Sequence, residues 1–222
     1  MTKAVVLLSG GLDSTTCLYW SKAKEFKTYA LIVDYGQRHG KEIFKAVKIA
    51  KTAGVPYNIV RFSLPWGGSA LIDKRMPVPK NRRPEKMAKD GIPSTYVPGR
   101  NTIFLSFAVS FAEAIGASAI IIGANAVDYS GYPDCRPNYI RSMQRAAALG
   151  TKSGSLGNTV KIIAPLIRLS KAGIIKLGKR LKVPYGATWS CYKGGQKPCM
   201  TCDSCLLRAK GFKEAGVDDP AL

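Results

Sequence analysis

Short apolar runs alternate with helix-compatible segments along most of this 222-residue chain, and no other feature constrains the fold as strongly. The alternation is typical of a parallel sheet that helices cover on both faces. The expected strands are residues 4–8, 29–33, 58–62, 119–123 and 161–164, and the expected helices are residues 14–24, 40–53, 101–115, 137–149 and 171–181. We therefore predict one α/β domain, residues 1–222, built on a doubly wound, five-stranded, Rossmann-like parallel sheet.

A glycine-rich string joins the first expected strand to the first expected helix, and it reads Ser9-Gly10-Gly11-Leu12-Asp13-Ser14. Two adjacent glycines let successive backbone N–H groups converge on an anion at the positive end of the following helix. The string is not a Walker loop, which needs Gly-x-x-x-x-Gly-Lys-Ser/Thr. We expect it to bind the phosphates of ATP, with Asp13 holding a Mg2+ ion, because hard cations prefer oxygen ligands. A plain glycine turn capped by serine and aspartate is the alternative.

Four of the six cysteines lie near the C-terminus in the pattern C-x7-C-x2-C-x2-C. Four thiolates without a histidine suit a closed tetrahedral structural zinc site. The expected Zn2+ ligands are Cys191, Cys199, Cys202 and Cys205, in a C-terminal helical segment, residues 188–222. An iron–sulfur cluster or a redox dithiol would use the same residues. Cys17 is expected on the packed side of the first helix, and Cys135, in a proline-rich loop, is a less favoured candidate nucleophile.

The cysteine content indicates the cellular compartment in which the chain works, and the apolar segments indicate whether it crosses a membrane. Lys3 is followed by only five apolar residues before the glycine loop, so we expect no export signal, a reducing compartment and a cytoplasmic protein. Residues 102–127 carry one charged side chain, Glu113, but Gly116 divides them into a helix too short to cross a bilayer and a buried strand. We therefore expect no membrane span.

The expected helix from Thr102 to Ile115 is apolar on nearly all sides, so one sheet face cannot cover it completely. We predict that a second copy of the chain covers the remaining surface in a homodimer.

Basic residues greatly outnumber acidic ones. The chain has 34 Lys and Arg against 14 Asp and Glu, a formal net charge of +20. They are spread from Lys3 to Lys213 rather than forming one block, which indicates at most non-specific attraction to nucleic acid.

Residues 63–100 break the strand and helix alternation. Several prolines and the basic run 80–86 forbid one continuous element there. So long a loop within a compact domain is usually functional or disordered. We predict a mobile lid over ATP, with a flexible surface loop as the equal alternative.

Five further strings occur in a characteristic order: Asp34–His39 (DYGQRH), Val97–Asn101 (VPGRN), Asp128–Pro137 (DYSGYPDCRP), Pro165–Lys171 (PLIRLSK) and Thr188–Tyr192 (TWSCY). Together with the glycine loop and the cysteines, they resemble the 7-cyano-7-deazaguanine synthase (QueC) family. The resemblance runs from Ala4 to Pro220, and the combination of ordered strings with the four cysteines makes it specific. It implies a fold of the adenine nucleotide alpha hydrolase type.

The resemblance also implies a reaction. Such an enzyme is an ATP-dependent carbon–nitrogen ligase that converts 7-carboxy-7-deazaguanine and ammonia to 7-cyano-7-deazaguanine, the precursor of queuosine and archaeosine. The carboxylate would be adenylated, displaced by ammonia to an amide, and the amide activated by ATP again before it becomes the nitrile. Positioning and charge stabilisation should supply most of the rate.

The resemblance assigns roles to particular residues. The ATP segment is Leu8, Ser9, Gly10, Gly11, Leu12, Asp13, Ser14, Thr15, Thr16, Cys17 and Leu18. Ser9, Asp13, Ser14 and Lys171 are the expected catalytic residues, with Lys171 reaching the departing phosphates. Arg100, Asn101, Asp128 and Asp134 are the expected substrate residues; Arg100 and Asn101 could instead cap their helix, and the two aspartates could instead cap loops. His39 is expected to make a loop hydrogen bond.

Two other classes of protein remain open. A pyrophosphate-loop enzyme acting directly on tRNA, by thiolation or lysine ligation, would use the same loop and a basic surface. A non-enzymatic zinc-bearing nucleic-acid module would use the cysteines but leave the glycine loop unexplained. Within the family, a relative that joins the deazaguanine to another acceptor is a further alternative.

Overall fold

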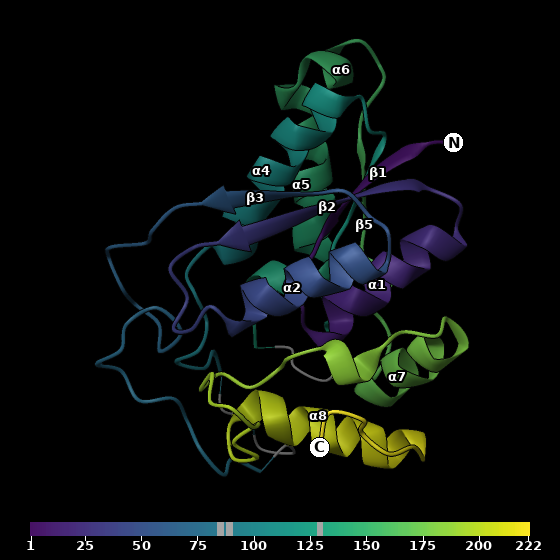
Figure 1. Ribbon diagram of the computed structural model, residues 1–222. Helices are drawn as coiled ribbons and strands as arrows, with labels where there is room; N and C mark the ends of the chain where they lie inside the picture. Colours follow the sequence, from purple (N-terminus) through teal and green to yellow (C-terminus); the bar gives the residue numbers. More distant parts are fainter. Residues whose placement is uncertain (84–86, 88–90, 128–130) are drawn as a thin grey trace.

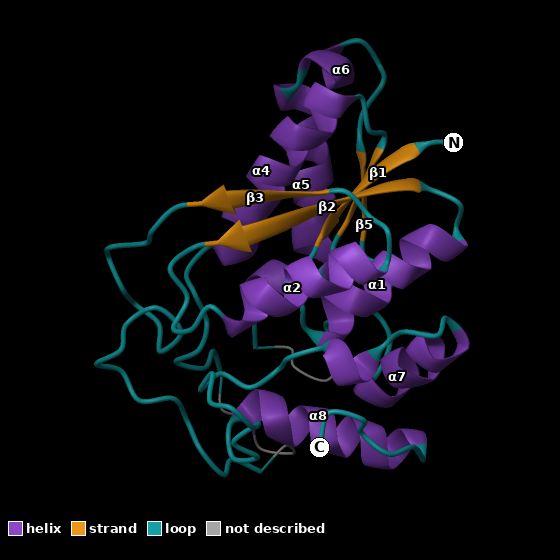
Figure 2. Ribbon diagram, in the orientation of Figure 1, coloured by secondary structure: helices purple, strands orange, loops and turns teal. Residues whose placement is uncertain are grey.

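The sheet of the predicted fold is present with all five strands. The computed structural model describes residues 1–83, 87, 91–127 and 131–222. The strands are β1 (Lys3–Leu7), β2 (Lys27–Asp34), β3 (Tyr57–Arg61), β4 (Ala119–Ile121) and β5 (Lys161–Ile163). Their order is β3-β2-β1-β4-β5, and each neighbouring pair is parallel. The chain therefore winds outward from β1 in both directions, which confirms the doubly wound prediction (Figure 2).

Both faces of this sheet are buried, because successive residues of a strand point to opposite sides. Val6 packs in the cluster beneath α1 (Leu12–Ala23) and α2 (Lys41–Thr52). Its neighbour Val5 packs in the cluster beneath α4 (Arg100–Ile115). A strand buried on both faces has a continuous apolar sequence, which is why residues 4–8 predict a strand.

The remaining helices extend the layers on both sides of the sheet, and two of them stack outward from α1. The remaining helices are α5 (Pro137–Gly150), α6 (Lys152–Ser155), α7 (Lys171–Arg180) and α8 (Asp203–Ala215), with 3-10 turns η1 (Pro133–Cys135) and η2 (Tyr185–Ala187). Figure 1 shows α4 and α5 on one side of the sheet and α1 and α2 on the other. α7 packs against α1, and α8 packs against α7 as the outermost layer. No described helix is long and apolar enough to cross a bilayer.

The largest differences from the predicted elements lie at the ends of β4 and β5. Both strands have three residues, whereas the apolar runs predicted five and four. Ile122 still donates its N–H to the carbonyl of Ile163 at 3.0 Å, but the chain after it leaves the sheet at Gly123. The periodicity did not delimit α8, which begins within the cysteine cluster at Asp203.

The segment between β3 and α4 lies against other parts of the molecule. Leu71 and Val78 are buried, and the guanidinium of Arg38 donates to the carbonyls of Ala70 and Met76 at 2.9 and 3.0 Å. Figure 1 shows this segment passing from β3 around to the cysteine-bearing end of the chain. Its mobility as a lid stays a prediction, and residues 84–86 and 88–90 lie outside the described residues.

Candidate functional site

A cavity of about 300 Å³ opens at the carboxyl edge of the sheet. It lies where the strand order switches between β1 and β4, the place at which open α/β sheets bind ligands. The predicted site residues that line it are Leu8, Ser9, Gly11, Leu12, Asp13, Ser14, Arg100, Asn101 and Lys171. The glycine loop and the start of α4 therefore face one space, as the two sets of predicted contacts require.

The glycine loop presents an uncapped helix start to this cavity. No side chain caps α1 at Gly11, so the first N–H groups of the helix have no partner supplied by a capping residue. The hydroxyls of Ser9 and Ser14 lie 2.9 Å apart, and Ser14 Oγ also accepts the N–H of Ser9 at 3.1 Å. Backbone donors at a positive helix end, with two hydroxyls beside them, form an arrangement that can bind phosphate.

Gly10 gives the loop a backbone conformation, and a close contact with α2, that a residue with a Cβ would disfavour. Its φ is +77°, and a Cβ there would lie 2.6 Å from the carbonyl oxygen of Glu42 and 2.7 Å from the backbone N of Ala46. Both atoms belong to the backbone of α2, which cannot rotate away as a side chain could. The close approach of α2 to the loop thus depends on the missing side chain.

Gly10→Ala is expected to destabilise the protein by about 2 kcal/mol or more, because strain at positive φ and a backbone clash add together. Chemical denaturation measures the change. Gly11→Ala is the matched control: Gly11 has a φ of −80°, and a Cβ there would lie 3.4 Å from its nearest neighbour. Equal destabilisation of the two variants would contradict the steric argument.

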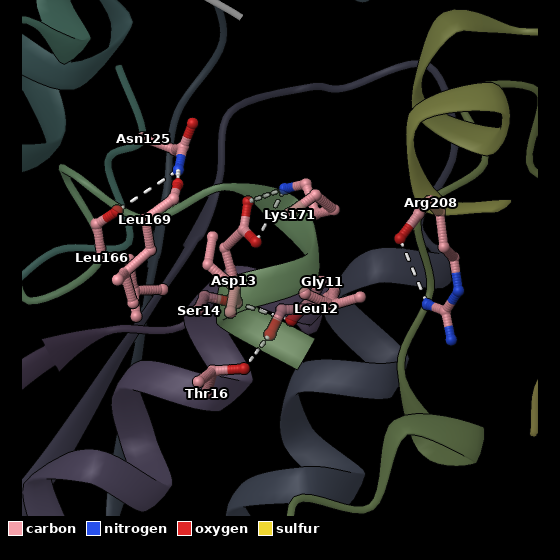
Figure 3. A network of polar contacts seen from close by, with 12 residues as sticks. Gly11, Leu12, Asp13, Ser14, Thr16, Asn125, Leu166, Leu169, Lys171 and Arg208 are labelled. Atoms are coloured by element: carbon pink, nitrogen blue, oxygen red, sulfur yellow. Dashed lines mark hydrogen bonds and ion pairs between the residues drawn. The ribbon is translucent and has the colours of Figure 1, made fainter. Parts of the chain in front are cut away.

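Lys171 lies at the start of α7 and forms an ion pair with Asp13. Its Nζ is 2.8 Å from both carboxylate oxygens, and Figure 3 shows the two side chains pointing toward each other at the start of α1. The pair is partly buried, with side-chain exposures of 16% for Lys171 and 28% for Asp13. The structure thus brings together two predicted catalytic residues that are far apart in the chain. It pairs them directly, an arrangement that the sequence did not predict.

The second half of the predicted ATP segment lies inside α1 and does not line the cavity. Thr15 and Thr16 are fully buried, and their hydroxyls donate to the carbonyls of Gly11 and Leu12 at 2.7 and 2.8 Å. Cys17 and Leu18 belong to the core, and burial raises the pKa of Cys17 well above its ordinary value. The packing of Cys17 agrees with the sequence prediction.

Arg100 and its neighbours form the opposite wall. The guanidinium of Arg100 lies beside the Tyr35 hydroxyl, whose pKa is raised by burial and lowered in part by this cation. Within the described residues, no carboxylate lies within ion-pairing distance of Arg100. A partly buried cation that faces a cavity and forms no ion pair with a described carboxylate is suited to an anionic ligand.

Asn101 and Asp134 bind each other at the start of α4. The carboxylate of Asp134 accepts the N–H of Asn101 at 3.0 Å, and Asn101 Nδ2 donates to the Asp134 carbonyl at 3.0 Å. Asp134 is buried and does not line the cavity, so its geometry is that of a helix-end acceptor. Its contact with substrate stays a prediction, and Asp128 lies outside the described residues.

Cys135 lines the cavity, but its environment favours the protonated thiol. Burial, with a smaller effect of the Asp134 charge, raises the pKa of Cys135 to about 11. A reactive cysteine requires the opposite shift. The structure therefore argues against the nucleophilic role.

The four clustered cysteines converge in space. The Sγ atoms of Cys191, Cys199, Cys202 and Cys205 all lie within 4.8 Å of one another. The backbone N–H groups of Cys199 and Cys202 point at the sulfurs of Cys191 and Cys199, at 3.3 and 3.4 Å. Hydrogen bonds from neighbouring thiols hold the pKa of Cys191 well below its usual range. Converging sulfurs with N–H donors around them fit a metal bound by four thiolates.

The cysteine segment is also tied to the glycine loop. The N–H of Trp189 donates to the carbonyl of Gly10 at 2.9 Å, two residues before the first clustered cysteine. The Trp189 indole N–H and His39 Nε2 both bond the Cys191 carbonyl, at 2.8 and 3.0 Å. The hydrogen bond of His39 is of the kind that the sequence predicted. Lys41 from α2 adds a cation–π contact, with its Nζ 3.9 Å from the Trp189 ring centroid.

Several residues that line the cavity were not predicted from the sequence. Glu42, in the first turn of α2, and Asp203, Ser204, Leu207 and Arg208, in α8, all line the cavity. Glu42 follows the DYGQRH string at the edge where parallel strands end, and that position could have indicated it. The α8 residues had no such signal, because the packing of α8 on α7 brings them there.

Comparisons with known proteins agree on one family. The family model described as queuosine biosynthesis protein QueC matches residues 3–216. The 7-cyano-7-deazaguanine synthase of Trichodesmium erythraeum is 55% identical over 222 residues, covering 99% of this chain and 100% of that relative. The protein of the same name from Trichormus variabilis is 54% identical over 220 residues, covering 98% of this chain and 96% of the relative.

A solved structure supports the fold. The NMN synthetase from Francisella tularensis matches with a TM-score of 0.51 and 14% identity, over 98% of this chain and 78% of that one. At this identity the likeness concerns the fold alone, and it agrees with the predicted Rossmann-like architecture.

Proposed function

The chain belongs to the QueC family of queuosine biosynthesis proteins, and from this premise we propose that it converts 7-carboxy-7-deazaguanine, ammonia and ATP to 7-cyano-7-deazaguanine. One observation carries the proposal beyond the family name. The open start of α1, the Asp13–Lys171 pair and the Arg100 cation face the same cavity. That cavity can hold a nucleotide phosphate and an anionic acceptor side by side.

Arg100 binds the substrate carboxylate in the first half of the reaction. A carboxylate oxygen attacks the α-phosphorus of ATP, the bond to the β-phosphate breaks, and pyrophosphate leaves. The N–H groups at the start of α1, with Ser9 and Ser14, hold the phosphates in line for this attack. Lys171 stabilises the negative charge that grows on the leaving pyrophosphate.

The second half repeats this activation on the amide. Ammonia displaces AMP from the acyl adenylate to form the amide. The amide oxygen then attacks a second ATP, and loss of the second AMP leaves the nitrile. The same phosphate-binding groups serve both halves, so one cavity is sufficient.

Two metals fit the side chains present. Asp13 is the carboxylate in the glycine loop, and it would hold Mg2+ when ATP is bound, which would free Lys171 for the phosphates. The four converging cysteines would hold Zn2+, which would stabilise the C-terminal segment. Neither thiolates nor zinc take part in the chemistry of this proposal.

Product analysis tests the function. The protein is incubated with ATP, ammonium and 7-carboxy-7-deazaguanine, and the products are measured by mass spectrometry. We expect the nitrile, with two AMP and two pyrophosphate formed for each nitrile. Accumulation of a different deazaguanine conjugate would assign the chain to another acceptor.

A requirement for tRNA would support the rival enzyme class instead. The formal net charge of +20 should retain RNA weakly at low salt, and this retention should fade as salt rises, because it comes from released counterions. ATP consumption should not depend on tRNA. If tRNA were needed for ATP consumption, the small-molecule proposal would be wrong.

We expect a homodimer in the cytoplasm. Phe107 on α4 is 36% exposed and stacks on Phe62 at a centroid distance of 5.4 Å, which leaves an aromatic surface beside the edge strand β3. Sedimentation velocity at micromolar concentration should show a species near twice 24.0 kDa. Strictly monomeric behaviour would exclude the dimer and leave the reaction unaffected.

A further inference from the structure

The proposed reaction removes every hydrogen of ammonia from its nitrogen. One N–H proton leaves when ammonia displaces the first AMP, one when the amide oxygen attacks ATP, and one when the second AMP departs. Phosphate binding does not supply an acceptor for these protons. If the proposed function holds, the cavity therefore needs a base in addition to its phosphate-binding groups.

Three described carboxylates line the cavity, and two of them form ion pairs with basic side chains. Asp13 is paired with Lys171 at 2.8 Å. Asp203 is paired with Arg82 at 2.9 Å, and its side chain is 3% exposed. The carboxylate of Glu42 makes no hydrogen bond or ion pair with any described residue, although Glu42 is only partly exposed.

Glu42 lies between the two halves of the site. Its backbone is close to the glycine loop, because a Cβ on Gly10 would lie 2.6 Å from its carbonyl oxygen. The Arg100 cation acts on its carboxyl from α4, across the same cavity. Glu42 thus has its backbone beside the glycine loop and its carboxyl within the electrostatic influence of Arg100, in the cavity that both line.

We infer that Glu42 is the general base that accepts the N–H protons in amide and nitrile formation. In the first step, the nitrogen bonds to the acyl carbon, the bond from carbon to the AMP oxygen breaks, and Glu42 takes one proton. In the second, the amide oxygen bonds to the α-phosphorus, pyrophosphate leaves, and Glu42 takes the next proton. In the third, AMP departs with the carbon–oxygen electron pair, and loss of the last proton completes the carbon–nitrogen triple bond. Glu42 releases each proton to water.

The electrostatics of the cavity suit this role. Burial raises the pKa of Glu42 to about 7, against the lowering effect of Arg100 and with a smaller raising effect of Cys191. Other ionisable groups lining the cavity are Asp13, Tyr35, Tyr132, Cys135, Lys171, Tyr192, Asp203 and Arg208. Burial raises the pKa values of Tyr35, Tyr132 and Cys135, which makes them poor bases at neutral pH. A base with a pKa near the working pH is the most effective.

Glu42→Gln separates this role from binding. Adenylation of the carboxylate breaks no N–H bond, so carboxylate-dependent exchange of labelled pyrophosphate into ATP, without ammonia, should proceed at the wild-type rate. Nitrile formation with ammonia should fall by about 10²–10⁴-fold. Glu214→Gln is the matched control, since it makes the same change at an exposed glutamate that pairs with Lys210 at 3.7 Å.

A pH profile supplies the second readout. With 7-amido-7-deazaguanine and ATP, the ionisation of ammonia plays no part. The wild-type rate should rise with pH up to about 7 and then level, because Glu42 must be deprotonated, and Glu42→Gln should lose this rise. Loss of pyrophosphate exchange in Glu42→Gln, or near-normal nitrile formation, would overturn the inference. A wild-type protein that makes no nitrile and shows no exchange would instead reject the proposed function.

Discussion

Asp13→Ala is expected to lower ATP-dependent turnover by about 10²–10³-fold or more, the loss typical when one group that stabilises transition-state charge is removed. Asp13 is the carboxylate of the glycine loop and the proposed Mg2+ ligand. Its loss also leaves Lys171 without its partner in the resting protein. Nitrile and AMP formation measure the effect, and titration calorimetry with ATP and Mg2+ locates it at nucleotide binding.

The fold of this variant should change little. Asp13 belongs to a partly exposed ion pair, and such pairs contribute modestly to stability. Glu113→Ala is a suitable control, because this exposed carboxylate bonds Ser153, away from the cavity. Thermal unfolding of the two variants should be similar, whereas only Asp13→Ala should be inactive. Wild-type activity of Asp13→Ala would refute the phosphate role of the loop.

Local patterns predicted the parts of the site that neighbours along the chain create. The strand, the glycine string and α1 are consecutive, so the proposed phosphate site is contained in one stretch of sequence. The cysteine cluster is similar, because three of its four cysteines lie within seven residues, from Cys199 to Cys205. In both cases the residue types restrict the chemistry before the fold is known.

Contacts between distant elements were not predictable in this way. Lys171 and Asp13 are 158 residues apart and meet because α7 packs on α1. Glu42 enters the cavity because Gly10 permits α2 to approach the loop. These contacts depend on how the helices pack on the sheet, which a periodic pattern does not specify.

Asp134 shows a second reason why the sequence alone does not specify the site: one residue type can serve two roles. An aspartate in a proline-rich loop can cap a helix or bind a substrate, and both roles use the same acceptor oxygens. Here the N–H of Asn101 occupies one of those oxygens at 3.0 Å. The position of the start of α4, which the loop sequence does not specify, gives Asp134 this helix-end contact, and its contact with substrate stays a prediction.

Cys199→Ser is expected to damage the fold rather than the chemistry. Structural zinc contributes about 10–16 kcal/mol to the folding of small zinc-binding peptides, so weakened binding should lower the melting temperature clearly. The wild-type protein should contain about one zinc per chain, and the variant should contain less. Metal analysis and thermal unfolding measure both effects, and iron with a visible absorption band would indicate a cluster instead.

The contact between the cysteine segment and the glycine loop extends this prediction to nucleotide binding. Trp189 donates to the Gly10 carbonyl at 2.9 Å, so loosening the segment that follows should also loosen the glycine loop, which we propose binds phosphate. Cys199→Ser should therefore bind ATP more weakly, although Cys199 does not line the cavity. Cys135→Ser is the matched control for metal content, because Cys135 lies outside the cluster. If Cys199→Ser lost zinc but kept wild-type ATP affinity, the loop would hold its shape without the metal site, and Gly10 and α2 alone would determine it.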